Sequence, residues 1–389
     1  MNSDPVVIVG AKRTPIGSFQ GGLSGLAAPA LGAIEIRGAL DDAGLAADDV
    51  SELLMGCVLP AGVGQAPARQ AGMGAGLPQG VPATTVNKVC GSGMRTVMMG
   101  HDQIVAGNAD IIVAGGMESM SNAPYLLDKA RQGARLGHGR MIDHMYLDAL
   151  EDAYDKGRLM GSFAEDTAEL FQFTREEQDA YALRSVERAR RAVADGSFNR
   201  EIASVKGKIE MVADEGPARA KPEKIPTLRA AFRDGGTVTA ATSASISDGA
   251  AAMVLMRLSE AEKRGLTPIA AIRGHTSFAH EPSRFTTAPI GAMRKLFERT
   301  GWSKDEVDLF EINEAFALVP MAAMRDLDLP ADKVNINGGA CVLGHPLGAS
   351  GARVLVTLMA ALEAHGLKRG VASLCIGGGE ATAMAVERL

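Results

Sequence analysis

Short apolar runs that end near glycines alternate with longer segments of helical spacing in the first third of the chain. The runs VVIVGA at residues 6–11 and DIIVAG at residues 110–115 are typical of buried strands. Between them, residues 26–43 repeat apolar side chains with helical spacing and stop at Gly44, as an amphipathic helix does. We expect strands at 6–11, 51–58, 83–89 and 110–115, and helices at 26–43, 66–75 and 92–106.

The same alternation returns after residue 300 and predicts an α/β fold, with helices on both faces of a mixed sheet. Here we expect strands at 307–312 and 371–376, and helices at 315–325 and 351–364. Residues 118–240 are different, because they carry charged runs, scattered glycines and one strongly charged helix at 175–194. We interpret this stretch as an insertion of loops and helices over the sheet, without an independent core.

The two regions of alternation also resemble each other in sequence. Residues 40–56 line up with residues 297–313, and SGMR from Ser92 meets SGAR from Ser350. DIIVAGG in the first region meets VASLCIGGG in the second with a few residues of slip. The chain therefore reads as two similar α/β halves. We expect an active site between them, since ligands bind where the ends of strands converge.

Composition places the chain among globular proteins and narrows its partners. Of its 389 residues, 46% are hydrophobic and 22% charged, which excludes disorder as the main state. The net charge of −6 argues against nonspecific nucleic-acid binding, which needs a basic surface. We expect no membrane-spanning stretch and no secretory signal. The four cysteines are widely separated, which is typical of free thiols in a reducing compartment, so we expect a cytoplasmic enzyme.

Cys90 lies in NKVCGSGM, between a predicted strand and a predicted helix. A thiol beside the start of a helix faces the positive end of the helix dipole, which lowers its pKa below ~8.5. Gly91 and Gly93 permit a tight turn and the close approach of a substrate. The position fits a cysteine nucleophile, and it also fits a small buried hydrophobic residue, as most free cysteines are.

His345 lies in the glycine-rich segment NGGACVLGHPLGASGAR, just before a helix that we expect to start near Ser350. Through the internal repeat, this helix start corresponds to the one near Cys90, so His345 could be the general base for a thiol. A structural histidine or a phosphate-binding loop would also fit. The segment lacks the Walker lysine and a G-x-G-x-x-G pattern, which weakens the nucleotide interpretation.

Two further segments end predicted strands with polar residues. Cys375 is followed by three glycines, whose N–H groups could bind an oxyanion while the thiol moves a proton. Asn313 and Glu314 follow an apolar strand and would face the same crevice. The alternatives are a core cysteine and a helix-capping asparagine. No C-x-x-C, H-x-x-x-H or H-E-x-x-H pattern occurs, so we expect no metal site.

Eight segments in this order resemble the sequence blocks of the thiolase family: AKRTPIG, GQAPARQ, NKVCGSGM, GGMESMS, SDGAAAMVL, NEAFA, GHPLGASGAR and CIGGG. The resemblance covers essentially the whole chain. It implies two βαβαβαββ halves in a five-layered αβαβα fold, and thioester chemistry on coenzyme A substrates without a further cofactor. The N-terminal half would span 1–117 and continue at about 241–265, a loop domain over the site would span 118–240, and the C-terminal half would span 266–389.

The resemblance also implies a role for each candidate residue. Cys90 would be the nucleophile that becomes acylated, His345 would activate it, and Cys375 would take a proton from the α-carbon of acetyl-CoA. Asn313 would hold a water that forms one oxyanion hole with His345, and the backbone N–H groups of Cys90 and Gly377 would form the other. Condensing two thioesters needs a nucleophile, a separate base and two stabilised oxyanions, and the chain offers a group for each.

NKVCGSGM is most similar to the acetoacetyl-CoA branch of the family, which condenses two acetyl-CoA molecules to acetoacetyl-CoA and CoA. The alternative is a broader 3-ketoacyl-CoA thiolase that acts in fatty-acid breakdown. Two segments depart from the acetoacetyl-CoA branch: Leu159 stands before Met160 where that branch often has His, and residues 241–245 read ATSAS where it often has GNASG. Both resemble pantetheine-contacting loops. The expected contacts to substrate or CoA are Met160, Phe232, Ala244, Ser245 and Phe316.

Coenzyme A carries phosphates, so an acidic protein needs a local basic site for it. The best basic cluster in the insertion is Arg219, Lys221, Lys224 and Arg229, of which we expect Arg219 and Lys224 to contact CoA; a solvated charged loop is the alternative. The segment 122–145 resembles the family's oligomerisation elements, and we expect a homotetramer. A ketoacyl synthase or a non-catalytic lipid carrier fits less well, because Cys90, His345 and Cys375 are all present.

Overall fold

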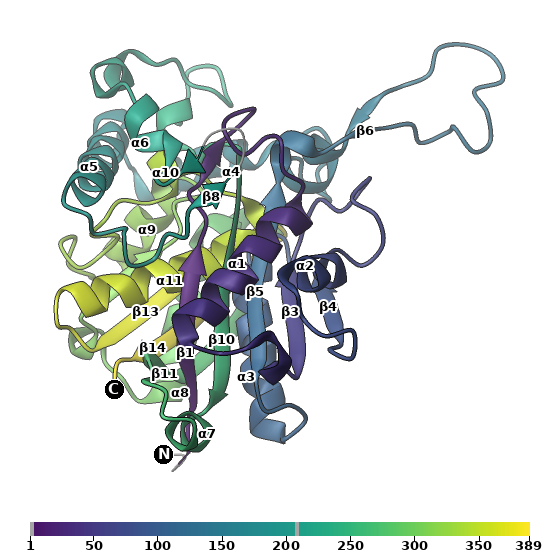
Figure 1. The fold of residues 1–389 in the computed structure, drawn as a ribbon. Coiled ribbons are helices and arrows are strands. Elements are labelled where there is room, and N and C mark those ends of the chain that lie inside the picture. Colours follow the sequence, from purple (N-terminus) through teal and green to yellow (C-terminus); the bar gives the residue numbers. More distant parts are fainter. Residues whose placement is uncertain (1–3, 207–209) are drawn as a thin grey trace.

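The computed structural model, which describes residues 4–206 and 210–389, is built around one large mixed sheet (Figure 1). The strands follow the order β12-β13-β14-β11-β1-β10-β5-β3-β4, and β2 (Gly17–Ser18) pairs with β10. Their bounds are β1 (Val6–Arg13), β3 (Glu52–Gly56), β4 (Ala83–Val86), β5 (Ile112–Ser119), β10 (Ser247–Arg257), β11 (Ala270–Ala279), β12 (Leu309–Ile312), β13 (Arg369–Ile376) and β14 (Glu380–Glu387).

The sheet repeats one pattern on either side of the β1–β11 pair. In the N-terminal half, β1 is antiparallel to β10, β10 is antiparallel to β5, and β5, β3 and β4 are parallel. In the C-terminal half, β11, β14, β13 and β12 follow the same directions, and a parallel bridge from Phe310 to Val334 stands where β4 would lie. Even the register breaks match, because one falls before Gly10 and the other before Gly274. The structure thus confirms the predicted duplication.

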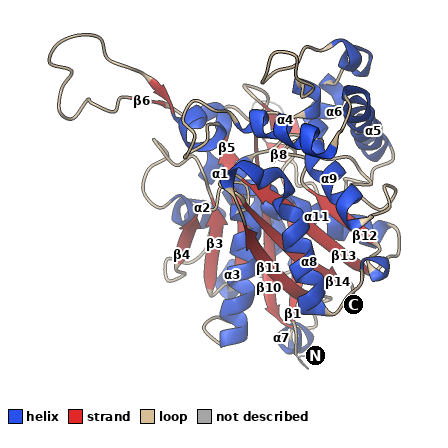
Figure 2. Ribbon diagram, turned by 180° about the vertical axis from the view of Figure 1, so that it is seen from behind, coloured by secondary structure: helices blue, strands red, loops and turns tan. Residues whose placement is uncertain are grey.

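Helices divide the molecule into five layers. α1 (Ala28–Ala43) and α2 (Pro67–Ala75) cover the outer face of the N-terminal strands, and α8 (Ala288–Thr300), with α9 (Leu318–Leu327) beside it, covers the C-terminal strands. α3 (Ser92–Ala106) and α11 (Leu347–Ala364) pack on each other between the halves, and α11 contacts β5 and β10 as well as β12 and β13 (Figure 2). Three apolar clusters fill the spaces between these layers.

Two predicted helix boundaries needed correction. α11 starts at Leu347 rather than at residue 351, since Pro346 occupies the position just before the helix, where a missing N–H costs nothing. α9 starts at Leu318 rather than at residue 315, because Phe316 instead forms an isolated bridge with Ser243. α3 and α5 (Arg175–Ala194) have the predicted bounds. Strands β10, β11 and β14, rich in alanine and glycine, add to the predicted set.

α11 is also long and apolar enough to cross a membrane, contrary to the expectation that no stretch would be. Its 18 residues have a mean hydropathy of 1.3, yet 89% of them are buried inside the protein. The helix is apolar because it forms half of the central layer and contacts strands on both sides. Among the described residues it is the one helix that meets this criterion.

The insertion covers the carboxyl end of the sheet with α4 (Met160–Phe171), α5 and α6 (Glu215–Arg219). α5 starts with a capping box, in which the Thr174 hydroxyl accepts from Glu177 N–H and the Glu177 carboxylate accepts from Thr174 N–H. The helix packs on α10 (Ala340–Leu343) of the C-terminal half. A hairpin with β6 (Tyr125–Leu126) and β7 (Ile142–Asp143) extends away from the body in both views (Figures 1 and 2). The remaining short elements are β8 (Val205–Lys206), β9 (Glu210–Met211) and α7 (Leu258–Lys263).

Candidate active site

Cys90 lies in a tight turn between β4 and α3. Val89, just before it, has φ +47°, a conformation that is rare and strained for a β-branched residue. Three hydrogen bonds hold the turn: Val89 N–H donates to Asn87 Oδ1 (2.9 Å), Lys88 N–H donates to Ser92 Oγ (2.8 Å), and Ser92 Oγ donates to the Val89 carbonyl (2.7 Å). The turn therefore fixes the thiol at the start of α3, as predicted.

The expected low pKa of the Cys90 thiol is wrong for this structure. Burial raises the pKa to about 11, although the backbone N–H groups of Gly377 and Cys90 itself lower it in part. The end of β13 covers the turn so closely that a Cβ on Gly91 would lie 2.4 Å from Cδ1 of Ile376. Desolvation therefore outweighs the effect of the helix start, and the resting group is a neutral thiol.

His345 has one ring nitrogen held and the other free. Its Nδ1 lies 2.5 Å from Ser350 Oγ, and the Ser350 hydroxyl donates to the Pro346 carbonyl (2.9 Å). A hydroxyl has one proton, so Ser350 Oγ must accept from Nδ1–H, and Nε2 keeps its lone pair. Nε2 is buried and has no hydrogen-bond partner among the described residues. Burial, and then the charge of Arg353, lower the pKa of His345 to about 3, so the resting ring is neutral.

Asn313 is oriented in the same way by a neighbouring group. The Arg353 guanidinium can only donate, and it lies 3.1 Å from Asn313 Oδ1. This leaves the Asn313 Nδ2 group, which is buried and has no partner among the described residues, to donate to a water or a substrate oxygen. Arg353 is itself held by the Glu311 carboxylate at 2.9 Å. Arg353 and Glu311 therefore position the amide.

Cys375 lies near the end of β13 and is completely buried. Burial, and then the nearby Cys90 thiol, raise the pKa of Cys375 well above its usual value. The hairpin that follows has φ +94° at Gly378 and +88° at Gly379, a conformation that side chains other than glycine rarely adopt. This turn brings the Gly377 N–H to the Cys90 sulfur. The structure therefore brings Cys90, Cys375 and Gly377 together.

An apolar wall lies beside Cys90, Cys375 and Gly377. Four of the residues expected to contact the substrate form or flank it: Met160, Phe232, Ala244 and Phe316. A Cβ on Gly377 would lie 3.5 Å from Sδ of Met160, which places Met160 over the turn. The Phe232 and Phe316 rings meet edge to face, with centroids 5.9 Å apart. Ala244 N–H donates to the Ala315 carbonyl (3.0 Å), so the 241–245 turn lies against the same segment.

The side chains of Ser245, Arg219 and Lys224, which were also expected to contact the substrate or CoA, are exposed. The Ser245 carbonyl accepts from His345 N–H (3.1 Å), so its backbone holds the histidine loop while its side chain is exposed. Arg219 is 57% exposed and pairs with Glu215 at 3.1 Å, and Lys224 is exposed in the short 3₁₀ segment Pro222–Thr227. In the described part of the chain, neither cation forms a hydrogen bond or ion pair with the candidate catalytic residues.

Two buried acids lie beneath the site: Glu314, which was expected at the crevice, and Glu118, the main feature that sequence reasoning missed. The Glu118 carboxylate accepts from the N–H groups of Val58 (3.0 Å), Leu59 (3.1 Å) and Gly348 (2.9 Å), so it joins both halves under the histidine loop. Burial raises its pKa to about 7. The Glu314 carboxylate accepts from Tyr181, Ser185, Asn335 and Cys341, which ties the insertion to the site. A charged residue within or just after an apolar run was the available signal.

The structure also brings together one group of residues that could hold a metal ion. His101, Asp102 and His275 converge, although the absence of short metal-binding motifs had led us to expect no metal site. The histidines lie on α3 and β11, far apart in sequence, so no local spacing could have indicated the group.

Family models match nearly the whole chain. Residues 6–259 match the model described as "Thiolase, N-terminal domain", and residues 266–388 match "Thiolase, C-terminal domain". The chain is 47% identical to an acetyl-CoA acetyltransferase of Chromobacterium violaceum, over 98% of this chain and 99% of that protein. It is 48% identical to acetyl-CoA acetyltransferase 2 of Arabidopsis thaliana, over 100% of this chain and 98% of that protein.

A solved structure has the same fold. The crystal structure of Acat5 thiolase from Ascaris suum in complex with coenzyme A superposes with a TM-score of 0.95 at 40% sequence identity. The match covers 99% of this chain and 100% of that one, so it includes both halves and the insertion.

Proposed function

The chain belongs to the thiolase family, and we propose that it catalyses the reversible Claisen condensation of two acetyl-CoA molecules to acetoacetyl-CoA and CoA. One observation carries the proposal: the Cys90 sulfur faces the Gly377 N–H and the Cys375 thiol. His345 adds a buried Nε2 that has no hydrogen-bond partner among the described residues. The relatives named acetyl-CoA acetyltransferase support this branch of the family.

The first half-reaction transfers an acetyl group to Cys90. His345 Nε2 takes the thiol proton as the sulfur attacks the thioester carbon, which avoids a free thiolate in a site where burial opposes it. The Cys90 and Gly377 N–H groups stabilise the oxyanion that forms on the carbonyl oxygen. The carbon–sulfur bond to CoA then breaks, and the departing sulfur takes the proton of Cys375. The products are acetyl-Cys90, protonated His345, the Cys375 thiolate and CoA.

The second half-reaction forms the carbon–carbon bond. The Cys375 thiolate takes a proton from the α-carbon of a second acetyl-CoA and becomes a thiol again. His345 Nε2–H, together with a water on the Asn313 amide, stabilises the enolate oxygen. The α-carbon attacks acetyl-Cys90, acetoacetyl-CoA leaves, and His345 returns its proton to the Cys90 sulfur. Both thiols and the neutral imidazole are regenerated, so the cycle balances.

A broader 3-ketoacyl-CoA thiolase would use the same groups, and the apolar wall is where the two functions would differ. Gly161 lies so close to Phe232 that a Cβ would sit 2.4 Å from its ring, and we propose that this tightly packed wall limits the length of the acyl chain. We therefore expect kcat/KM for thiolysis to be highest with acetoacetyl-CoA and to fall at least tenfold by the six-carbon substrate. An equal or rising kcat/KM over 3-ketoacyl-CoA chains of increasing length would instead favour the degradative function.

We also propose a homotetramer in a reducing compartment such as the cytoplasm. The β6–β7 hairpin exposes large apolar side chains, which are costly in water and suit a contact between copies. These are Tyr125 (61% exposed), Leu127 (61%), Leu136 (97%) and Met141 (71%). All four cysteines are free, which fits a reducing environment. Light scattering that gives a monomer at micromolar concentration would contradict the assembly.

A further inference from the structure

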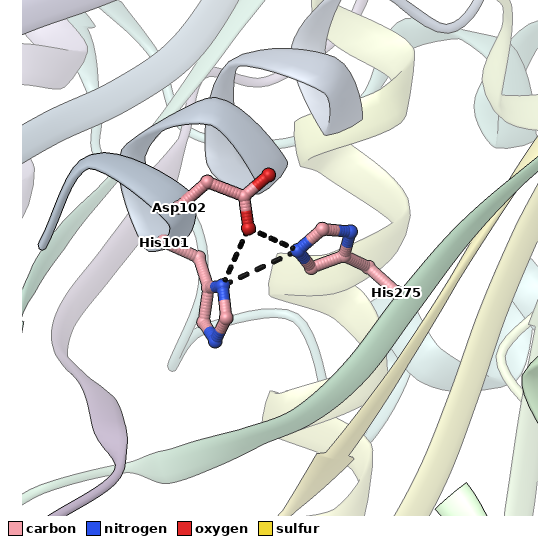
Figure 3. Close-up of side chains that lie close together, drawn as sticks. All are labelled: His101, Asp102 and His275. Atoms are coloured by element: carbon pink, nitrogen blue, oxygen red, sulfur yellow. Dashed lines mark hydrogen bonds and ion pairs between the residues drawn. The ribbon is translucent and has the colours of Figure 1, made fainter. Parts of the chain in front are cut away.

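Three side chains that the reaction does not use converge at the end of α3 opposite Cys90. Figure 3 shows His101 and Asp102 on the helix and His275 on β11 pointing toward one another. His275 Nε2 lies 2.9 Å from Asp102 Oδ1 and 3.2 Å from His101 Nδ1, and the third edge, from His101 Nδ1 to Asp102 Oδ1, is 3.1 Å. The three ligand atoms therefore form a nearly equilateral triangle.

Hydrogen bonds alone do not satisfy this triangle. Each ring nitrogen of a neutral imidazole carries either one proton or one lone pair, and a carboxylate only accepts. If both nitrogens donate to Asp102 Oδ1, which can accept two hydrogen bonds, the 3.2 Å edge between the histidine nitrogens carries no hydrogen bond. If His101 Nδ1 accepts instead, its lone pair faces the lone pairs of Asp102. A cation bound to all three atoms removes this conflict.

The size of the triangle fits a zinc ion. Zinc binds histidine nitrogen and carboxylate oxygen at about 2.0–2.2 Å in tetrahedral sites, which puts neighbouring ligand atoms about 3.3 Å apart. The three edges of 2.9, 3.1 and 3.2 Å are close to this spacing. Two histidines and one carboxylate form a common zinc ligand set, and the fourth position is open to water. Water can reach it, because the Asp102 side chain is 54% exposed.

A cation lies beside the group: the Arg299 guanidinium donates to the His275 backbone carbonyl at 3.1 Å.

The duplicated half has apolar residues at the three matching positions. Gly10 matches Gly274 in the sheet and Ser92 matches Ser350 in the helices, which pairs His275 with Ala11, His101 with Met359 and Asp102 with Ala360. These three counterparts also converge, since they line one small cavity. The three matching positions thus hold apolar side chains in one half, beside a cavity that Arg200, Glu201 and Glu363 also line, and three metal-ligand types in the other.

We propose that His101, Asp102 and His275 bind one divalent ion of the zinc class, completed by water. Because α3 belongs to the N-terminal half and β11 to the C-terminal half, the ion would tie the two halves together. The helix that it anchors carries Cys90 at its other end, about 15 Å away along the axis.

The test is a Zn²⁺ titration of the full-length protein by isothermal calorimetry, with bound metal counted after equilibrium dialysis. Free thiols bind zinc as well, so the comparison between variants carries the result. We expect Asp102→Ala and His275→Gln each to bind one ion fewer per chain than the wild type, or to bind it at least tenfold more weakly. His138→Gln, an exposed histidine on the hairpin, is the matched control and should bind as the wild type does.

Thermal unfolding supplies a second measurement, in which zinc bound by thiols exposed on unfolding affects the wild type and the variants alike. A ligand that binds only the folded state raises Tm, so Zn²⁺ should raise the Tm of the wild type and of His138→Gln, but not that of Asp102→Ala. Asp102 is largely exposed, so this variant should fold even if His275→Gln does not. Equal zinc stoichiometry, affinity and Tm shift in the wild type and Asp102→Ala would overturn the proposal.

Discussion

His345 donates its Nδ1 proton to Ser350 Oγ across 2.5 Å, because the only proton of that hydroxyl is already given to the Pro346 carbonyl. The contact selects the tautomer whose Nε2 can accept a proton from Cys90. Ser350 lies in the first turn of α11, and the Glu118 carboxylate holds Gly348 in the same turn. The first turn of α11 thus sets the orientation of the His345 ring.

Removing the Ser350 hydroxyl should therefore slow acetylation without weakening substrate binding. We expect Ser350→Ala to reduce the rate of Cys90 acetylation about 10- to 100-fold, part of what a positioned general base contributes, with the Kd for acetyl-CoA unchanged. Stopped-flow acetylation measures the rate. Thr357→Val is the matched control, since it removes from the same helix a buried hydroxyl that donates to Glu201. A wild-type rate in Ser350→Ala would contradict the role.

The nucleophile can be identified by mass. Cys90→Ala should fold normally, because the thiol forms no hydrogen bond that holds the turn, and it should show no covalent acetyl group after incubation with acetyl-CoA. Intact-mass spectrometry should find one acetyl adduct per chain in the wild type and in Cys341→Ala, whose thiol donates to the Glu314 carbonyl in the wild type. An adduct that persists in Cys90→Ala would exclude Cys90.

Variants of Cys90 and Cys375 should block different half-reactions. Cys375→Ser should still acetylate at Cys90 but lose condensation and the exchange of acetyl α-protons with deuterated water. A serine hydroxyl is too weak an acid to form the alkoxide that would replace the thiolate base. NMR of the acetyl group measures the exchange, with Cys341→Ser as the control for a free, partly buried thiol. Exchange at the wild-type rate in Cys375→Ser would mean that Cys375 is a core residue.

The order of strands and helices and the duplication could be predicted from sequence, because glycines such as Gly44 and Gly301 end matching helices in matching places. Cys90, Cys375 and Gly377 could be expected together, since Cys90 and Gly377 follow strands and Cys375 lies near the end of one, all at the same edge of the sheet. Their catalytic roles stay predictions.

Other features could not be read from local patterns. Burial decides the pKa of Cys90, and a strand-to-helix turn in the sequence does not reveal what will cover it. The orientation of Asn313 depends on Arg353, which lies on another element and looks like an isolated charge in an apolar helix. The cluster with His275 joins residues that only the fold brings near each other.

Glu118 should make stability depend on pH between about 5 and 7. Its pKa is raised from 4.5 to about 7 in the folded state, so within this window the folded protein binds more protons than the unfolded chain does. Stability must then fall as pH rises, by about 2–3 kcal/mol for this group between pH 5 and 8. Urea unfolding at the two pH values measures the loss. Between the two pH values, the unfolding free energy of Glu118→Gln should fall by about 2–3 kcal/mol less than that of the wild type, whatever the absolute stability of the variant. An equal fall in both proteins would contradict the raised pKa of Glu118.

The basic cluster of the insertion gives a last prediction, about the nucleotide end of coenzyme A. If Arg219 and Lys224 face its phosphates, the double change Arg219→Gln, Lys224→Gln should raise the KM for acetyl-CoA about two- to tenfold. The KM for an acetyl-pantetheine thioester, which lacks those phosphates, should stay the same. Folding should survive, because Glu215 keeps the N–H groups of Ser18 and Gly22 as partners when Arg219 is lost.

The matched control for this pair removes two cations of similar exposure elsewhere. Arg294 is 58% exposed and pairs with Asp326, as Arg219 is 57% exposed and pairs with Glu215. Helix α7, which ends at Lys263, lies near the N-terminus in Figure 1, at the end of the molecule opposite α5 and α6 of the insertion. Arg294→Gln, Lys263→Gln should leave both KM values unchanged. The effect at Arg219 and Lys224 should shrink as salt rises, since exposed charges are screened. An equal rise in KM for both thioesters would place the nucleotide elsewhere and leave the cluster a solvated loop.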